Sequence, residues 1–127
     1  SLNEADLRDH LFGEKKYAEV LLAEEAGAVG GVALFFPNYS TFRGKPGIYL
    51  EDLYVVPEAR GKGYGKALLV ALAKLAVERD FCRVEWSVLN WNTPSIDFYK
   101  ALGATPMDEW TVYRVMDEAL TKLADRV

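Results

Sequence analysis

A glycine-rich segment at residues 60–65, RGKGYG, constrains the fold of this chain more than any other feature. It follows an apolar run typical of a strand, residues 48–56, and precedes an apolar run typical of a helix, residues 67–77. The first N–H groups of a helix have no partner within the helix, and the helix dipole adds partial positive charge there. Glycines let the backbone take positive φ and approach a ligand closely. The segment therefore predicts a pyrophosphate cradle.

The spacing of this segment also fits an ordinary turn before a helix, so the motif needs support from elsewhere in the chain. It is not a Walker loop, because no Gly-Lys-Ser/Thr follows. It is not a dinucleotide fingerprint either, since the spacing is G-x-G-x-G and no acidic residue closes a second strand at the expected distance. The charges of Arg60 and Lys62 favour an anionic group at the turn.

The composition narrows the function classes. At 127 residues, half of them hydrophobic, the chain is expected to form one domain, residues 1–127, with one core. The net charge of −4 disfavours nucleic acid as a partner. One histidine, His10, and one cysteine, Cys82, argue against Ser-His or Cys-His catalysis, an internal disulfide and a bound metal. Without a signal peptide or an apolar membrane span in the sequence, we expect a cytoplasmic protein that does not bind membranes.

The hydrophobic pattern predicts an α/β (α+β) fold with a mixed, twisted sheet and helices on both faces. Strand 48–56 should place Tyr49, Glu51 and Leu53 on one face and Leu50, Asp52 and Tyr54 on the other. The expected elements are helix 6–11, strands 18–24 and 29–36 joined by a turn at 26–27, loop 37–47, strand 48–56, helix 65–79, strand 82–89, helix 93–102, strand 110–116 and helix 118–124.

Three segments carry a family resemblance: YLEDLYVVPEARGKGYGKALL, LNWNTPSIDFYKALGA and YSTFRGK. Together they resemble the GCN5-related N-acetyltransferase (GNAT) superfamily, in its diamine (spermidine/spermine) acetyltransferase branch. The YSTF segment is more similar to the subgroup that acts on thialysine, because Ser40 stands near where the polyamine enzyme has an aspartate. The resemblance implies the GNAT acyl-CoA N-acyltransferase fold, with the first strand and helix missing from this chain.

The resemblance also implies acetyl-CoA as cosubstrate, and no metal. Leu53, Tyr54 and Val55 would contact the cofactor, with the backbone groups of Leu53 and Val55 pairing with the pantetheine arm as an added strand would. The pyrophosphate would lie against Arg60, Gly61, Lys62, Gly63, Tyr64, Gly65 and Lys66, with Asn92, Ser95 and Tyr99 on the other side of the cofactor.

For the chemistry, the resemblance makes Tyr99 the general acid that protonates the departing thiolate, and a phenol is a suitable donor. Glu51 would hold the ammonium of the amine or pass on its proton. An anionic slot for a small cationic amine would be lined by Glu51, Asp52, Glu85, Trp86, Ser87, Asp108 and Glu109. We therefore expect direct acetyl transfer in a ternary complex, from acetyl-CoA to a primary amine of a small cationic substrate that is a diamine or polyamine or is thialysine-like.

Other interpretations stay open at the level of sequence. The chain could be a non-catalytic, CoA-binding regulatory domain, or an N-acetyltransferase acting on protein or peptide amines. Tyr99 could be a packed helix residue, and Cys82 could take the acetyl group covalently, although no histidine is placed to activate it. The resemblance also implies a homodimer, for which strand 110–116 would be the exchanged segment.

Overall fold

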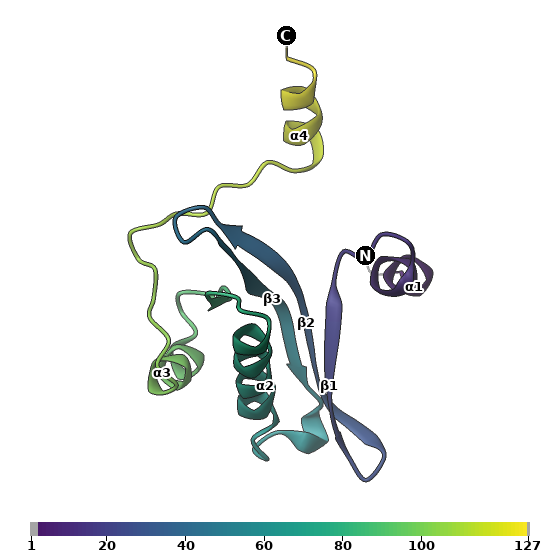
Figure 1. Cartoon of the computed structure of the whole chain (residues 1–127), viewed down its shortest axis with the longest axis vertical. Helices are drawn as coiled ribbons and strands as arrows, with labels where there is room; N and C mark the ends of the chain where they lie inside the picture. Colours follow the sequence, from purple (N-terminus) through teal and green to yellow (C-terminus); the bar gives the residue numbers. More distant parts are fainter. Residues whose placement is uncertain (1–2, 127) are drawn as a thin grey trace. The chain divides into compact units, whose positions relative to one another are not determined.

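The computed structural model describes residues 3–126 and contains a mixed four-stranded sheet with one long helix beside it (Figure 1). The contacts of the chain divide it into two compact units, the first ending at Ser87 and the second beginning at Val88. The first unit holds α1 (Glu4–Phe12), β1 (Glu19–Glu25), β2 (Ala28–Ser40), β3 (Lys45–Val55), the 3₁₀ turn η1 (Pro57–Ala59), α2 (Tyr64–Glu78) and β4 (Val84–Glu85). The second unit holds α3 (Thr93–Ala101) and α4 (Asp117–Ala124).

The sheet has the order β1-β2-β3-β4, in which the first three strands are antiparallel and β4 runs parallel to β3. The predicted hairpin at its start is confirmed. Ala26 and Gly27 have φ angles of 53° and 80°, and two consecutive positive φ values are typical of the tight turns that join twisted antiparallel strands. The mixed sheet confirms the predicted fold class.

The core of the first unit lies between the sheet and α2, which contacts all four strands. Leu68, Leu69, Leu72 and Ala76 are buried at helical spacing and form the inner face of α2. The sheet contributes Ala33, Phe35, Ile48 and Leu50. Burying one such large aliphatic side chain contributes roughly 1.5–3 kcal/mol, so this single helix–sheet layer supplies much of the stability of the unit.

An ion pair fastens the end of α2 to the first strand. Both amino groups of the Arg79 guanidinium bond the Glu19 carboxylate, at 2.9 and 2.6 Å. This hydrogen bond holds the pKa of Glu19 below its ordinary value and raises the pKa of Arg79. Each side chain is about one-third exposed, so solvent weakens the contribution of the pair.

The predicted loop 37–47 is wrong, because β2 continues to Ser40 and β3 already begins at Lys45. Pro37 had indicated the end of a strand, since proline cannot donate to a sheet ladder. The pairing of β2 with β1 ends at Phe35, so the missing N–H of Pro37 faces no neighbouring strand. The turn that follows is tight: the N–H of Gly44 bonds the Ser40 carbonyl at 2.7 Å.

The predicted alternation of side chains along the third strand is also wrong. The register shifts between Leu34 and Phe35, because Leu34 pairs with Asp52 and Phe35 with Leu50, so Glu51 is an extra residue in β3. A bulge of this kind resets the alternation of faces. As a result Leu50 and Leu53 share the face toward α2, whereas Tyr49, Asp52 and Tyr54 occupy register positions on the opposite face.

Two further strand predictions need correction. Strand 82–89 is reduced to Val84–Glu85, since pairing with β3 ends at Tyr49, just before the bulge. Over residues 110–116 the structure has no strand, because this stretch pairs with no other strand among the described residues, and Trp110, Val112 and Tyr113 are highly exposed. A strand needs a partner for its backbone groups, and local β-propensity does not supply one. The helices predicted on either side of this stretch are confirmed as α3 and α4.

Candidate functional site

The glycine-rich turn lies between η1 and α2 and has the backbone that only glycine adopts easily. Gly61 and Gly63 have φ angles of 81° and 85°, in the left-handed region. A Cβ placed on either residue would meet no atom within 4 Å. The space in front of the turn is therefore open to a ligand, and the positive φ angles account for the glycines.

The start of α2 presents amides without acceptors. Gly63 caps the helix and has no side chain with which to bond the first-turn N–H groups. Among the backbone hydrogen bonds of residues 3–126, the turn uses the N–H of Lys62, which bonds the Ala59 carbonyl, and of Ala67, which bonds the Gly63 carbonyl. The N–H groups of the intervening residues make no backbone bond: Gly63, Tyr64, Gly65 and Lys66. Such a set of free donors at a helix N-terminus suits an anion.

Three cationic residues neighbour these amides in the sequence. Arg60, Lys62 and Lys66 are exposed, and no carboxylate of residues 3–126 lies within ion-pair distance of any of them. The Arg60 Nε donates to the Val55 carbonyl at 3.2 Å, which holds the guanidinium beside the turn. Open glycines, free amides and unpaired cations at one place fit a diphosphate group, so the residues present match the group that the sequence predicted.

The strand that leads into the turn has an open edge. The Val56 N–H bonds the Gly30 carbonyl at 2.9 Å, so in the alternating antiparallel ladder the backbone groups of Tyr54 also face β2. The groups of Leu53 and Val55 then face the other edge, where pairing with β4 has already ended at Tyr49. The backbone groups of Leu53 and the N–H of Val55, whose carbonyl already accepts a bond from Arg60, can therefore pair with an added strand-like ligand, as predicted for the pantetheine arm.

The bulge is responsible for this orientation. Before it, the Ile48 N–H bonds the Arg83 carbonyl at 2.9 Å, so the even-numbered residues of β3 face β4. After it, the odd-numbered residues Leu53 and Val55 take that edge. Glu51, the extra residue, and Asp52 beside it are exposed at this point. Both predicted carboxylates thus lie where the open edge begins.

The remaining predicted substrate residues of the first unit already have partners. Glu85 forms an ion pair with the Arg83 Nε at 3.0 Å and accepts a hydrogen bond from the Asn38 Nδ2 at 3.1 Å. The Ser87 and Tyr49 hydroxyl groups hydrogen-bond each other at 2.8 Å. Trp86, which lies between Glu85 and Ser87 in the sequence, is half-buried. The sequence analysis missed Arg83, Asn38 and Tyr49, because their role depends on which residues β4 pairs with.

The other predicted site residues belong to the second unit, which is described by itself. Asn92 caps α3, and its side chain accepts a hydrogen bond from the Ser95 N–H at 3.3 Å. Tyr99 is half-buried, and its ring lies 5.6 Å from that of Phe98. The exposed pair Asp108 and Glu109 precedes the extended stretch at 110–116. Their predicted places beside a cofactor and an amine stay predictions.

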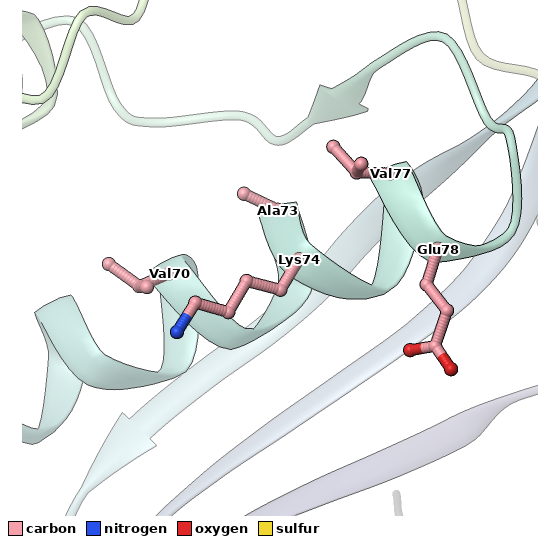
Figure 2. A pocket seen from close by; sticks show the side chains of 5 residues that line it. All are labelled: Val70, Ala73, Lys74, Val77 and Glu78. Atoms are coloured by element: carbon pink, nitrogen blue, oxygen red, sulfur yellow. The ribbon is translucent and has the colours of Figure 1, made fainter.

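A shallow hollow of about 420 Å³ lies on the outer side of α2 and is separate from these features. Figure 2 shows the side chains that line it, Val70, Ala73, Lys74, Val77 and Glu78. None of them belongs to the glycine-rich turn or to the open edge of β3. Within residues 3–126, no helix is long and apolar enough to cross a membrane, and no three His, Cys, Asp or Glu side chains are grouped to hold a metal ion.

Comparison with known proteins agrees with this geometry. L-ornithine N5-acetyltransferase NATA1 of Arabidopsis thaliana is 47% identical over 92 residues, which cover 72% of this chain and 40% of that protein. Thialysine N-epsilon-acetyltransferase of Bos taurus is 37% identical over 136 aligned positions, covering 98% of this chain and 79% of that protein. A solved integron cassette protein from the mobile metagenome of V. cholerae has a TM-score of 0.85 and 31% identity, covering 98% of this chain and 80% of that one.

The family model described as "Acetyltransferase (GNAT) family" matches residues 2–104, which include α1, the whole sheet, the glycine-rich turn and α3. The match to the plant relative spans less than half of that protein's length. The chain belongs to the acetyltransferase (GNAT) family of acyltransferases.

Proposed function

We propose that this chain transfers the acetyl group of acetyl-CoA to a primary amine of a small cationic substrate. The observation that carries this proposal is the continuity of two features. An open strand edge at Leu53 and Val55 runs directly into a turn with free amides and unpaired cations. CoA has an amide-bearing arm followed by a diphosphate, so one ligand matches both features in order.

In the proposed mechanism acetyl-CoA, when bound, supplies an acetyl group activated as a thioester. The backbone of Leu53 and Val55 holds the arm, and the turn at 60–66 holds the diphosphate. The Tyr99 hydroxyl would donate a proton to the departing sulfur, for which a phenol has suitable acidity, and the second proton that the amine nitrogen loses as the amide forms would return to the phenolate. The Glu51 carboxylate holds the ammonium of the substrate and takes up its proton, because only the neutral amine attacks.

For the substrate, we propose a linear amine such as ornithine or thialysine, named after the amines of the two relatives. The exposed carboxylates of Glu51 and Asp52 suit a second positive charge on such a chain. The Glu85 carboxylate is already paired with Arg83, so its contribution to an anionic slot is smaller than the sequence suggested. Polyamines, which carry more positive charge, rank lower.

The test has two parts on the same protein. Titration calorimetry measures the affinity for CoA, and a thiol-release assay measures turnover of acetyl-CoA with ornithine, thialysine, spermidine and an N-terminal peptide. Binding of CoA together with release that depends on a small amine supports the proposal. Binding without turnover of any amine indicates a regulatory CoA-binding domain, and the absence of CoA binding refutes the proposal.

We also propose that the protein works as a homodimer, in which residues 110–116 pair with a second copy. Trp110, Val112 and Tyr113 are 76%, 82% and 91% exposed, and apolar side chains at these levels favour burial against a partner. Light scattering after size exclusion measures the mass. Replacing Val112 and Tyr113 by serine should shift the mass toward that of a monomer, and an unchanged mass contradicts this assignment.

A further inference from the structure

Tyr64 is the first residue of α2, and its side chain extends to the β1–β2 hairpin. Its hydroxyl donates to the Glu25 carboxylate, the last residue of β1. Its ring lies so close to Gly30 of β2 that a Cβ on Gly30 would overlap it. Resting on the proposed binding of CoA, we infer that Glu25, Gly30 and Tyr64 are positioning residues that hold the glycine-rich turn in its diphosphate-binding form.

Gly30 contacts both ends of the turn. Its carbonyl accepts the N–H of Val56, the residue that enters the turn, at 2.9 Å. The ring of Tyr64, the residue that follows the turn, packs against the Cα of Gly30. Gly30 of β2 therefore sets the distance between Val56 and Tyr64, the residues on either side of the turn. The intervening segment, residues 57–63, includes two glycines with positive φ, so a fixed span restricts its backbone.

Glu25 lies at the end of the β1–β2 ladder. It pairs with Ala28 across the two-residue turn at Ala26 and Gly27, and a bulge between Ala23 and Glu24 precedes it. Tight turns of this type match the twist of the strands they join, so the sheet ladder defines the position of Glu25. Tyr64 thus connects the start of α2 to the end of this hairpin.

A direct role of Glu25 in binding the diphosphate is excluded by its charge, because a carboxylate repels an anion. The hydrogen bond that Glu25 accepts from the Tyr64 hydroxyl explains why a carboxylate lies near the proposed anion site. The same bond raises the pKa of the Tyr64 phenol above its usual value, so the hydroxyl stays a donor throughout the neutral range. A turn that is ordered before binding loses less conformational entropy when the ligand arrives.

The experiment compares Y64F, which keeps the ring and removes the hydroxyl, with E25A and E25Q. Hydrogen exchange of the amides at 61–66 is measured without ligand, and CoA affinity is measured by calorimetry. We expect Y64F and E25A each to speed exchange in the turn and to weaken CoA binding about 3- to 10-fold, the loss of one net hydrogen bond. E25Q keeps an acceptor oxygen and should restore slow exchange, and the double variant Y64F/E25A should be no worse than either single one.

Y17F serves as the matched control, because Tyr17 is exposed and its ring packs on His10, which lies outside the turn. The positioning role concerns affinity, so Y64F should raise KM for acetyl-CoA by a larger factor than it lowers kcat. Unchanged amide exchange and unchanged CoA affinity in Y64F overturn the inference. Tighter CoA binding in both E25A and E25Q also overturns it, because it would show that the Glu25 carboxylate acts only by repelling the diphosphate. If the wild-type protein does not bind CoA, the proposed function fails, whereas the exchange comparison still decides whether Tyr64 orders the turn.

Discussion

Replacing Gly63 by alanine separates the role of this residue in folding from its role in binding. Gly63 caps α2 with a φ of 85°, and an added Cβ would touch no protein atom within 4 Å. In the unliganded protein the substitution therefore introduces backbone strain without a clash. In the complex the same methyl group would stand in the space proposed for the diphosphate.

The two effects differ in size. Holding alanine in a left-handed conformation costs about 1–2 kcal/mol, and the reduced freedom of the unfolded chain returns about 0.4–1 kcal/mol. The net destabilisation is about 1 kcal/mol, which for a domain of this size lowers the Tm by about 4 °C. Losing one or two hydrogen bonds to a charged group costs about 1.5–3 kcal/mol each, so CoA affinity should fall at least tenfold.

Gly44 provides the matched control. It has a φ of 65° and an equally open Cβ direction, but it lies in the turn between β2 and β3. Calorimetry of thermal unfolding and of CoA binding on G63A and G44A gives the comparison. We expect similar losses of Tm and a loss of affinity confined to G63A. Equal CoA affinity in the two variants would show that Gly63 serves only the backbone, and the assignment of the turn as a diphosphate site would be wrong.

Further predictions concern stability and catalysis. Glu19→Gln should lower the free energy of unfolding by about 0.5–1 kcal/mol at pH 7. Because Arg79 depresses the pKa of Glu19, this difference between the variants is present above about pH 4.5 and is lost as the pH falls through the lowered pKa. Urea unfolding at a series of pH values measures it. Leu72→Ala, at a fully buried position, should cost about 2–5 kcal/mol in the same assay, and a loss below 1 kcal/mol would contradict the described core. Tyr99→Phe should lower kcat by about 100-fold or more while CoA affinity is kept, and equal rates would remove this phenol from the mechanism. Glu51→Gln should raise KM for the amine with little change in KM for acetyl-CoA, and unchanged amine kinetics would place the amine elsewhere.

Features that depend on neighbouring residues in the sequence were predictable. The turn at 26–27, the glycine that ends α3, and the Asn92-Thr93-Pro94 start of that helix follow from local backbone chemistry. The inner face of α2 follows from the spacing of its leucines. Each of these signals acts within about four residues, so no knowledge of the tertiary structure is needed to interpret it.

Features that depend on distant partners were not predictable in the same way. The extra residue in β3 is visible only when Asp52 is found opposite Leu34 while Leu50 lies opposite Phe35. The continuation of β2 through Pro37 depends on where β1 stops. The anchoring of Tyr64 on Glu25 joins residues 39 positions apart, and nothing in the glycine-rich motif indicates it.

The bulge at Glu51 also bears on which ligand the proposed site would prefer. In a regular ladder, with Glu51 paired in its turn, the backbone groups of Leu53 and Val55 would face β2 and be taken up by the sheet ladder. Inorganic phosphate or a simple nucleotide would use the amides of the turn alone. A ligand that also needs the open edge of β3 must carry amide groups at a set distance from its diphosphate. The proposed site, an open strand edge followed directly by the glycine-rich turn, is therefore expected to prefer a CoA thioester to smaller phosphate compounds.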